Sequence, residues 1–426
     1  MNRPKSDPAV FAISTEGFLS RLSFGLVSIA LPLYALHLGM SVTAIGLLVS
    51  VNVMIQIAVK PLLGTLSDRF GHKRTLAVSI AARSVIPLLL VFAQSPWELF
   101  AIRMIYGLAQ SLRDPALNAL IAVSGRRERV ASTFAWYHTG KNAAASIGRA
   151  GGALLLGVTA ANYALVFEIS FVLSLLPLWV VLAYVHEDRT VAQPIPRRVG
   201  PGGPTGPRPL SVFPFTMLGF LFGTTAGMLN LFPVLAQKYF GLTNGQIGLI
   251  LLVSTFVIVV SGPLFGWLAD NGRRNLVLLI RGIANTLSSL MYLAFPTVWG
   301  VGLSKAIDDG GKAAFRPAWG SIMAEVASYD GRRRARTMSL IDVGEDAGDA
   351  LGPVLAGLLL SIGGLPVMFG VRVALALATE LYASIVNRRL ERQDLLREGA
   401  ESRRAAGMDP NEAEVPPQAM VEGYVR

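Results

Sequence analysis

Apolar segments about 20 residues long recur along most of the chain, and this pattern constrains the fold more than any other feature. A helix needs about 20 mostly apolar residues to cross roughly 30 Å of hydrocarbon. Of the 426 residues, 52% are hydrophobic and 15% are charged. The mean hydropathy of +0.52 is far above that of a soluble globular protein. The sequence therefore predicts an all-α polytopic membrane protein.

Twelve segments meet this description, and we predict that each forms a transmembrane helix. Residues 186–210, at the midpoint of the spans, are rich in Pro and Gly and are predicted to link two six-helix bundles, 1–185 and 211–388. Residues 389–426 are expected to form a cytoplasmic tail that is partly disordered. The approximate bounds of the spans are 10–37, 42–66, 74–94, 97–123, 131–158, 162–185, 211–237, 243–269, 275–295, 298–325, 335–361 and 364–387.

Lys and Arg residues gather in alternate loops. A basic cluster follows every even-numbered span, whereas odd-numbered turns such as 38–41 and 361–364 carry almost no charge. Because Lys and Arg in short loops stay on the cytoplasmic side, both termini are expected in the cytoplasm. This distribution accounts for the net charge of +11 without a nucleic-acid partner. The expected location is a bacterial inner membrane or a compartment derived from it.

The two predicted bundles share an internal repeat. The segment KPLLGTLSDRFGHKR, which starts at Lys60, matches GPLFGWLADNGRR, which starts at Gly262, at an offset of 202. The same offset pairs Arg103 with Lys305, and an offset of 204 pairs Gly148 with Gly352. The repeat predicts two related, pseudo-symmetric halves.

The segment from Gly64 to Arg74 resembles the signature G-x-L-a-D-r-x-G-r-k of the major facilitator superfamily, and the element from Arg103 to Gly107 is similar to the family's R-x-x-x-G. The resemblance covers about residues 10–388 and implies a secondary transporter with twelve helices. It implies a gate latch, in which Asp68 meets a helix N-terminus and basic residues while the outside is open. The simpler alternative is a turn with cytoplasmic positive charges. The residues of this gating motif are Gly64, Asp68, Arg69, Gly71, Lys73 and Arg74, with Asp270 in the second copy.

Charged residues inside predicted spans are candidates for a substrate or coupling-ion site. Such a residue costs about 2.5–3.5 kcal/mol to insert, so it should face protein or water and have a partner. We expect an acidic partner for Arg103. Glu16 and Arg21 are expected either to pair with each other or to face the cavity. The resemblance implies a role for Arg103 in proton coupling or substrate binding. The candidates are Arg103, Asp114, His138, Lys141, Lys305, Asp308, Asp309, Lys312, Glu345, Asp346 and Asp349. Five charged residues of the predicted helix 298–325 recur at spacings that place them along one face: Lys305, Asp308, Asp309, Lys312 and Arg316.

Four acids, Asp342, Glu345, Asp346 and Asp349, share one face of the predicted helix 335–361. Three interpretations remain open: an ion-pair network, a cation or proton site, or simple proximity to the cytoplasmic end. Clustered carboxylates are hard oxygen ligands, so Glu345, Asp346 and Asp349 are candidate metal ligands, and His138 could assist a transition metal.

These features predict transport by alternating access about a midplane site, coupled to protons through intramembrane carboxylates. The chain has no cysteine, no nucleotide-binding loop and no catalytic constellation, so neither an enzyme nor a cofactor is expected. A small polar or cationic solute, including a metal ion such as iron, is the favoured substrate of a protein that functions as a monomer. The alternatives are efflux of drug-like compounds and a non-transporting scaffold or sensor. Arg149 weakens the drug-efflux alternative, because drug antiporters of the superfamily usually have Pro at this position.

Overall fold

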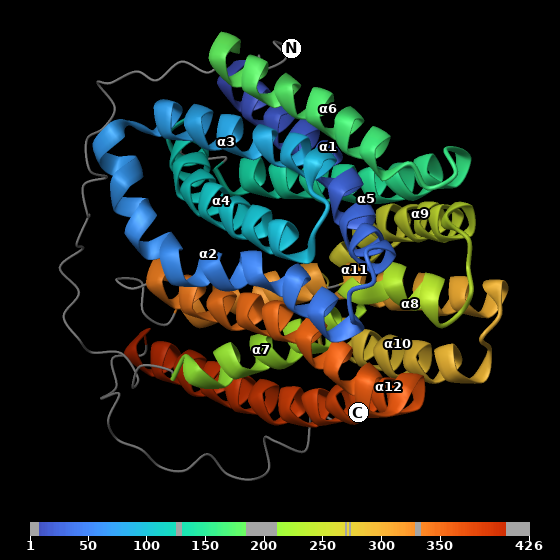
Figure 1. The fold of residues 1–426 in the computed structure, drawn as a ribbon. Helices are drawn as coiled ribbons and strands as arrows, with labels where there is room; N and C mark the ends of the chain where they lie inside the picture. The colour runs from blue at the N-terminus through green and yellow to red at the C-terminus, as the bar shows by residue number, and fades with distance from the viewer. Residues whose placement is uncertain are drawn as a thin grey trace, which may run out of the picture.

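The computed structural model describes residues 8–124, 130–184, 211–268, 271, 274–328 and 334–405. Within these ranges every regular element is a helix, and no strand is present (Figure 1). The helices of the first half are α1 (Pro8–His37), α2 (Val42–Phe70), α3 (His72–Phe92), α4 (Pro96–Ser124), α5 (Val130–Val158) and α6 (Tyr163–Tyr184). Those of the second half are α7 (Phe213–Gly227), η2 (Met228–Leu231), α8 (Phe232–Lys238), α9 (Asn244–Leu268), α10 (Arg274–Ala294), α11 (Val298–Ser328) and α12 (Arg334–Ala405).

In two places the helix labels do not correspond one-to-one with the predicted spans. The elements α7, η2 and α8 follow one another without a gap and correspond to the predicted span 211–237. In contrast, α12 contains two helices, because Gly363 and Gly364 have non-helical backbone angles. Gly364 has φ +67°, a conformation that glycine adopts without the steric cost that a side chain adds. The chain therefore turns between the predicted spans 335–361 and 364–387.

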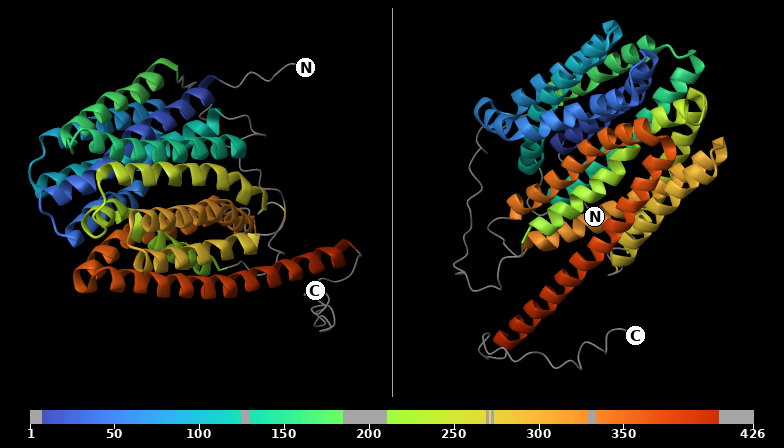
Figure 2. Two further views of the ribbon diagram at one scale, coloured as in Figure 1. Left: turned by 90° about the vertical axis from the view of Figure 1, so that its right-hand side faces the viewer. Right: turned by 60° about the horizontal axis from the view of Figure 1, so that its bottom comes forward.

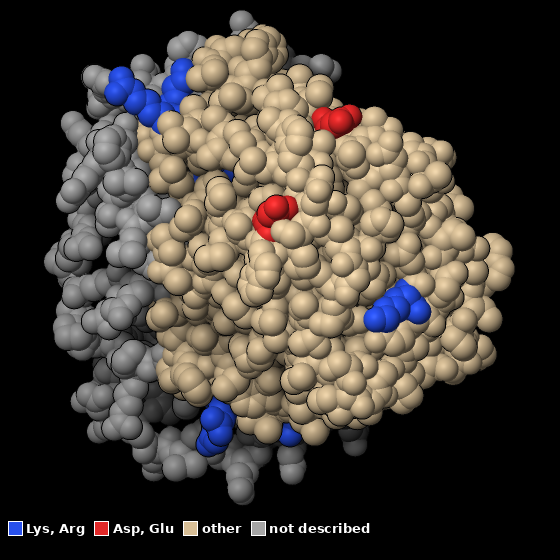
Figure 3. Space-filling model, in the orientation of Figure 1, with Lys and Arg blue, Asp and Glu red and all other residues tan. Residues whose placement is uncertain are grey.

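Eight segments of the described chain are long and apolar enough to cross a membrane, and one of them, Thr337–Leu390, includes both helices of α12. The helices α4, α5 and α11 are outside this set. The predicted all-α membrane fold is confirmed, whereas the count of twelve spans stays a prediction. Figure 3 shows a broad face with few charged side chains, and large apolar side chains such as Trp299 and Phe256 are exposed, 88% and 69% respectively. Lipid covers such a surface in a membrane.

The helices form two packed groups, one from each half of the chain (Figures 1 and 2). In the first group α1 packs against α5 and α6, and α4 packs against α2 and α3. In the second group α7 packs against α12, and α11 against α9 and α10. Figure 2 also shows the second helix of α12 extending beyond the bundle.

Glycines bring the innermost helices of each half close together. A Cβ added at Gly148 of α5 would lie 2.3 Å from the carbonyl oxygen of Leu22 in α1. In the second half, a Cβ at Gly348 of α12 would lie 2.1 Å from the carbonyl oxygen of Phe220 in α7. Small residues permit such backbone contact in membrane helices. The pair α1–α5 therefore has its counterpart in α7–α12.

The two halves share one apolar core at one end of the molecule and have separate cores at the other. The shared core joins residues next to the odd-numbered turns of both halves, including Leu31, Leu48, Val234 and Phe369. We call this the closed end. At the opposite end, two clusters contain residues of one half each: the first includes Ile13, Ile80, Leu117 and Val181, and the second includes Phe222, Trp319, Ile341 and Val386.

At the closed end, two close backbone contacts join the two halves. In the contact between α2 and α12, a Cβ at Gly46 would lie 2.3 Å from the carbonyl oxygen of Pro353, and the Thr43 hydroxyl donates to the Gly357 carbonyl at 3.0 Å. In the contact between α5 and α9, a Cβ at Gly157 would lie 2.8 Å from the Cα of Gly245. The closed end therefore depends on glycines at the crossing points.

Candidate functional site

Asp308 of α11 is the centre of a buried charge network in the second half. Its Oδ1 accepts a hydrogen bond from Arg372 Nη2 at 2.6 Å and lies 3.4 Å from Arg281 Nη1, and its Oδ2 lies 2.9 Å from Lys312 Nζ. Asp308 and Arg372 are fully buried. One carboxylate from α11 thus joins cations from α10, α11 and the second helix of α12.

The neighbouring Asp309 lies near both lysines of α11. Lys305 Nζ donates to both carboxylate oxygens of Asp309 at 2.6 Å, and Lys312 Nζ lies 3.7 Å from Oδ1. The predicted charged face of this helix, Lys305 to Lys312, is therefore present as one connected network. Lys312 is the most accessible member, with 29% of its side chain exposed.

Arg281 and Arg372 are not among the predicted site residues, although the sequence carries a signal for both. Each lies in the middle of a predicted apolar span, 275–295 or 364–387, where a charged residue requires a partner. Arg372 also donates to the carbonyl oxygens of Thr225 and Asn285 and to the hydroxyl of Ser289. This guanidinium ties α7, α10 and α11 to α12.

The expectation of an acidic partner for Arg103 is wrong. Its Nε donates to the carbonyl oxygen of Leu48, and its Nη2 donates to the Val49 carbonyl and to Asn52 Oδ1. Its guanidinium also lies 5.5 Å from the centre of the Tyr106 ring. The residue is 7% exposed, and its partners show that it fastens α4 to α2.

Replacing Arg103 with Gln should lower the unfolding free energy by about 1.5–3 kcal/mol, because charged hydrogen bonds to α2 are lost. Thermal or denaturant unfolding of the purified protein measures this. Arg74→Gln, at an exposed residue, is the control and should be unchanged. Wild-type stability together with lost transport in Arg103→Gln would instead assign Arg103 to the substrate site.

The predicted pair between Glu16 and Arg21 is also wrong. Glu16 of α1 binds Arg113 of α4, whose Nη2 lies 2.8 Å from Oε1 and 2.7 Å from Oε2. Both side chains are at least 98% buried. Arg113 lies inside the predicted span 97–123, where its charge in an apolar segment was the signal for a partner.

The four acids of α12 occupy different environments. Asp342 and Asp346 are exposed, whereas Glu345 and Asp349 are half-buried, and Asp349 Oδ1 accepts a hydrogen bond from Asn230 Nδ2 at 3.0 Å. All four have partners within the protein. Among the described residues, no three His, Asp or Glu side chains form a group that could hold a metal ion. The geometry therefore does not support a metal site at Glu345, Asp346 and Asp349.

Arg149 of α5 is exposed and lies within electrostatic range of acids of the second half, although no described carboxylate is within ion-pair distance of it. The carboxylates of Asp309 and Asp349 attract it across the boundary between the halves, and Arg21 repels it. Its Nη2 donates to the Ser146 hydroxyl at 3.0 Å. The arginine at the position of the antiporter proline is therefore attracted by two acids of the second half.

The structure describes only some of the gating-motif residues and of the other candidates. Of the gating motif, Gly71 has φ +90° at the turn between α2 and α3, Lys73 Nζ donates to the Leu182 carbonyl, and Arg74 is exposed. Lys141 of α5 is half-buried and has a partner. The side chains that are not described are those of Asp68, Arg69, Asp114, His138, Asp270 and Arg316, and the surroundings of Gly64 are not described either.

Comparison with solved structures shows that the fold is shared with membrane transporters. A POT family transporter in complex with 5-aminolevulinic acid matches with a TM-score of 0.72 at 14% identity, covering 92% of this chain and 98% of that one. A bacterial homologue of the human lysosomal transporter Spinster, in an inward-facing and occupied conformation, matches with a TM-score of 0.65 at 15% identity, covering 92% and 98%.

Sequence relatives span nearly the same length. Multidrug resistance protein MdtG of Serratia proteamaculans (strain 568) is 28% identical over 379 residues, covering 86% of this chain and 90% of the relative. The protein of that name from Salmonella paratyphi C (strain RKS4594) is 26% identical over 395 residues, covering 88% and 94%. A family model described as Major Facilitator Superfamily matches residues 15–243 and 215–405. The match covers nearly the whole chain, and the fold consists of two helical halves that enclose buried charges. The chain therefore belongs to the Major Facilitator Superfamily of transporters.

Proposed function

We propose that this chain exports organic compounds by alternating access, with a proton as the coupling ion. The observation that carries the proposal is the arrangement of apolar cores, one shared core at the closed end and a separate core in each half at the other. Halves that separate at one end can rock about a site between them. The names of the MdtG relatives support organic compounds as the substrate class.

The alternating distribution of Lys and Arg supports an orientation. Basic clusters follow the even-numbered spans, so we place that end and both termini in the cytoplasm. The closed end, formed by the odd-numbered turns, then faces the outside. In this orientation the structure corresponds to a state closed toward the outside.

Asp349 is the coupling residue that the geometry favours. It lies on the first helix of α12, half-buried, and attracts Arg149 of the other half. A proton on Asp349 removes that attraction, so protonation changes the free energy of holding the halves together. Asp308 and Asp309, in contrast, are held by buried cations of their own half.

Everted membrane vesicles provide the test. Wild-type protein should accumulate members of a panel of organic compounds when a proton gradient is imposed, and Asp349→Asn should lose the dependence on the gradient. Glu168→Gln, at an exposed acid of α6, is the matched control and should keep it. Divalent metal ions and small inorganic cations belong to the same panel. Uptake of these ions without uptake of any organic compound would overturn the proposed substrate class, and transport of no compound would favour a scaffold or sensor.

A further inference from the structure

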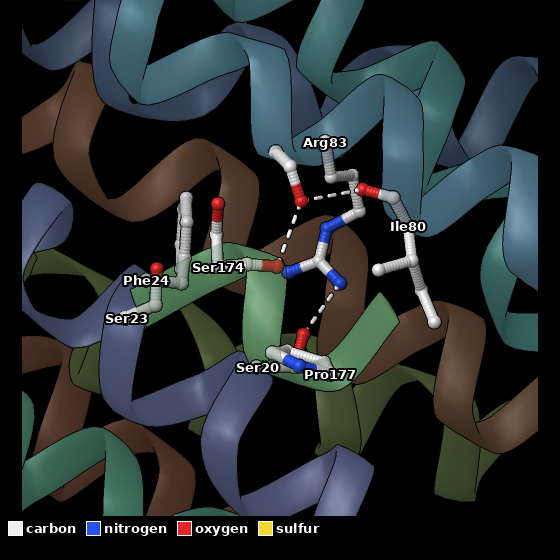
Figure 4. Close-up of a pocket in the computed structure, with 8 residues that line it drawn as sticks. Ser20, Ser23, Phe24, Ile80, Arg83, Ser174 and Pro177 are labelled. Carbon is white, nitrogen blue, oxygen red and sulfur yellow. Dashed lines mark hydrogen bonds between the residues drawn. The ribbon is translucent and has the colours of Figure 1, made fainter. Parts of the chain in front are cut away.

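A small cavity lies inside the first half, between α1, α3 and α6 (Figure 4). Its lining includes Arg83 and four serines, Ser20, Ser23, Ser84 and Ser174. The volume open to the centre of a water-sized sphere is about 20 Å³. One water needs about 10–15 Å³ by this measure, so the cavity holds a guest of one or two non-hydrogen atoms.

Arg83 brings a positive charge to this cavity and leaves it largely uncompensated. The residue is 7% exposed, and its Nη1 donates to the Ser20 hydroxyl at 2.9 Å. Its Nε has no acceptor among the described residues, and none of their carboxylates lies within ion-pair distance. Because a guanidinium has five N–H donors, most of its hydrogen-bonding capacity is unused.

The neighbouring charged residues do not compensate the positive charge of Arg83. Glu16 is a carboxylate whose charge reaches Arg83, but both of its oxygens bind Arg113. Arg113 and Arg21 act on Arg83 as like charges. The buried charges of the described first half are Arg83, Arg103 and Arg113 against Glu16, which leaves an excess of cations. A buried ion without a counter-charge is costly, so a compensating anion is expected.

The internal repeat shows what the first half lacks. The offset of 202 that pairs Arg103 with Lys305 also pairs Tyr106 with Asp308. In the second half, the Asp308 carboxylate is the counter-ion of Arg281 and Arg372. In the first half, the matching Tyr106 places its ring 5.5 Å from the guanidinium of Arg83, a cation–π contact that attracts the cation but carries no negative charge. The first half therefore has the cation but not the carboxylate.

We propose that the Arg83 cavity binds a small monovalent anion of chloride size, which takes the place of the Asp308 carboxylate in the first half. The Nε–H of Arg83 and the hydroxyl of Ser20 are the donors. The Ser20 oxygen accepts from Arg83, while its own proton has no acceptor among the described residues. A water molecule could fill the same volume but would leave the charge of Arg83 uncompensated. Larger anions exceed the cavity.

The test compares the unfolding temperature of the purified full-length protein in sodium chloride, sodium bromide and sodium gluconate at equal ionic strength. Gluconate is too large to enter. Wild-type protein should unfold about 2 °C or more higher in either halide, because a ligand that binds only the folded state stabilises it. Arg83→Gln should lose this difference. Lys238→Gln, at an exposed cation of α8, is the matched control and should retain it.

Two further measurements keep the outcome decisive if a variant fails to fold. Tyr106→Asp supplies a carboxylate at the position of Asp308, so its unfolding temperature should no longer respond to halide. Crystals of the wild-type protein grown in bromide should show an anomalous peak between Arg83 and Ser20. Equal unfolding temperatures in halide and gluconate, a halide response that persists in Arg83→Gln, or bromide crystals with no anomalous peak would each overturn the proposal.

Discussion

Asp308→Asn is expected to lower the unfolding free energy by about 3–5 kcal/mol and to abolish transport. The substitution removes the carboxylate that faces Arg281, Lys312 and Arg372. Removing one partner of a buried ion pair leaves uncompensated charge in a medium where water cannot solvate it. Thermal or denaturant unfolding of the purified protein measures the loss of stability, and uptake into everted vesicles measures transport.

Two comparisons locate the cause of the Asp308→Asn effect. Asp309→Asn should be less damaging, because Asp309 faces the two lysines of its own helix and no arginine of another helix. Glu168→Gln removes an exposed acid of α6 and should leave stability unchanged. If Asp308→Asn unfolds at the wild-type temperature, the network does not hold α10, α11 and α12 together.

Gly46→Ala is expected to open the closed end and to reduce transport. Even a methyl group at Gly46 would lie 2.3 Å from the Pro353 carbonyl oxygen. Overpacking costs about 1–3 kcal/mol, which shifts the balance between two conformations by about 5- to 150-fold. The shift should disfavour the state in which α2 and α12 are in contact.

The absence of cysteine makes this shift measurable with one introduced thiol. Ser50 of α2 is 1% exposed, and its hydroxyl has no partner among the described residues, so Ser50→Cys is a mild substitution. A membrane-impermeant maleimide added outside intact cells should label Ser50→Cys faster when Gly46→Ala is also present. Gly151→Ala is the control, because a Cβ there meets nothing within 4 Å. Equal labelling in all three proteins would contradict the role of Gly46 in closing this end.

The helical membrane fold was predictable because its cause is local. About 20 apolar residues in succession form a helix wherever lipid surrounds them, since the backbone must satisfy its own hydrogen bonds there. The repeat between the segments at Lys60 and Gly262, and the motif from Gly64 to Arg74, identified the family for the same reason, because both can be recognised along the chain itself. The face shared by Lys305, Asp308 and Lys312 followed from helical periodicity.

The candidate site was predictable only in part. Periodicity placed Asp308 and Asp309 on the correct face but could not show that Arg281 and Arg372 reach it from other helices. The same limit produced the wrong partner for Glu16, since Arg21 is near in sequence while Arg113 is near in space. For Arg103 the acceptors are mostly backbone carbonyls of α2, which every residue carries and which no sequence pattern distinguishes.

The sequence by itself determined that the chain is an all-α membrane protein of its superfamily, and it predicted that each intramembrane charge needs compensation. The tertiary structure alone decided which group compensates which charge, where the two halves meet, and how the acids of α12 divide between exposed and half-buried positions. The physical reason is that burial and helix formation depend on the composition of one segment. Electrostatic compensation instead depends on distances of a few ångströms between segments that the packing of different helices brings together.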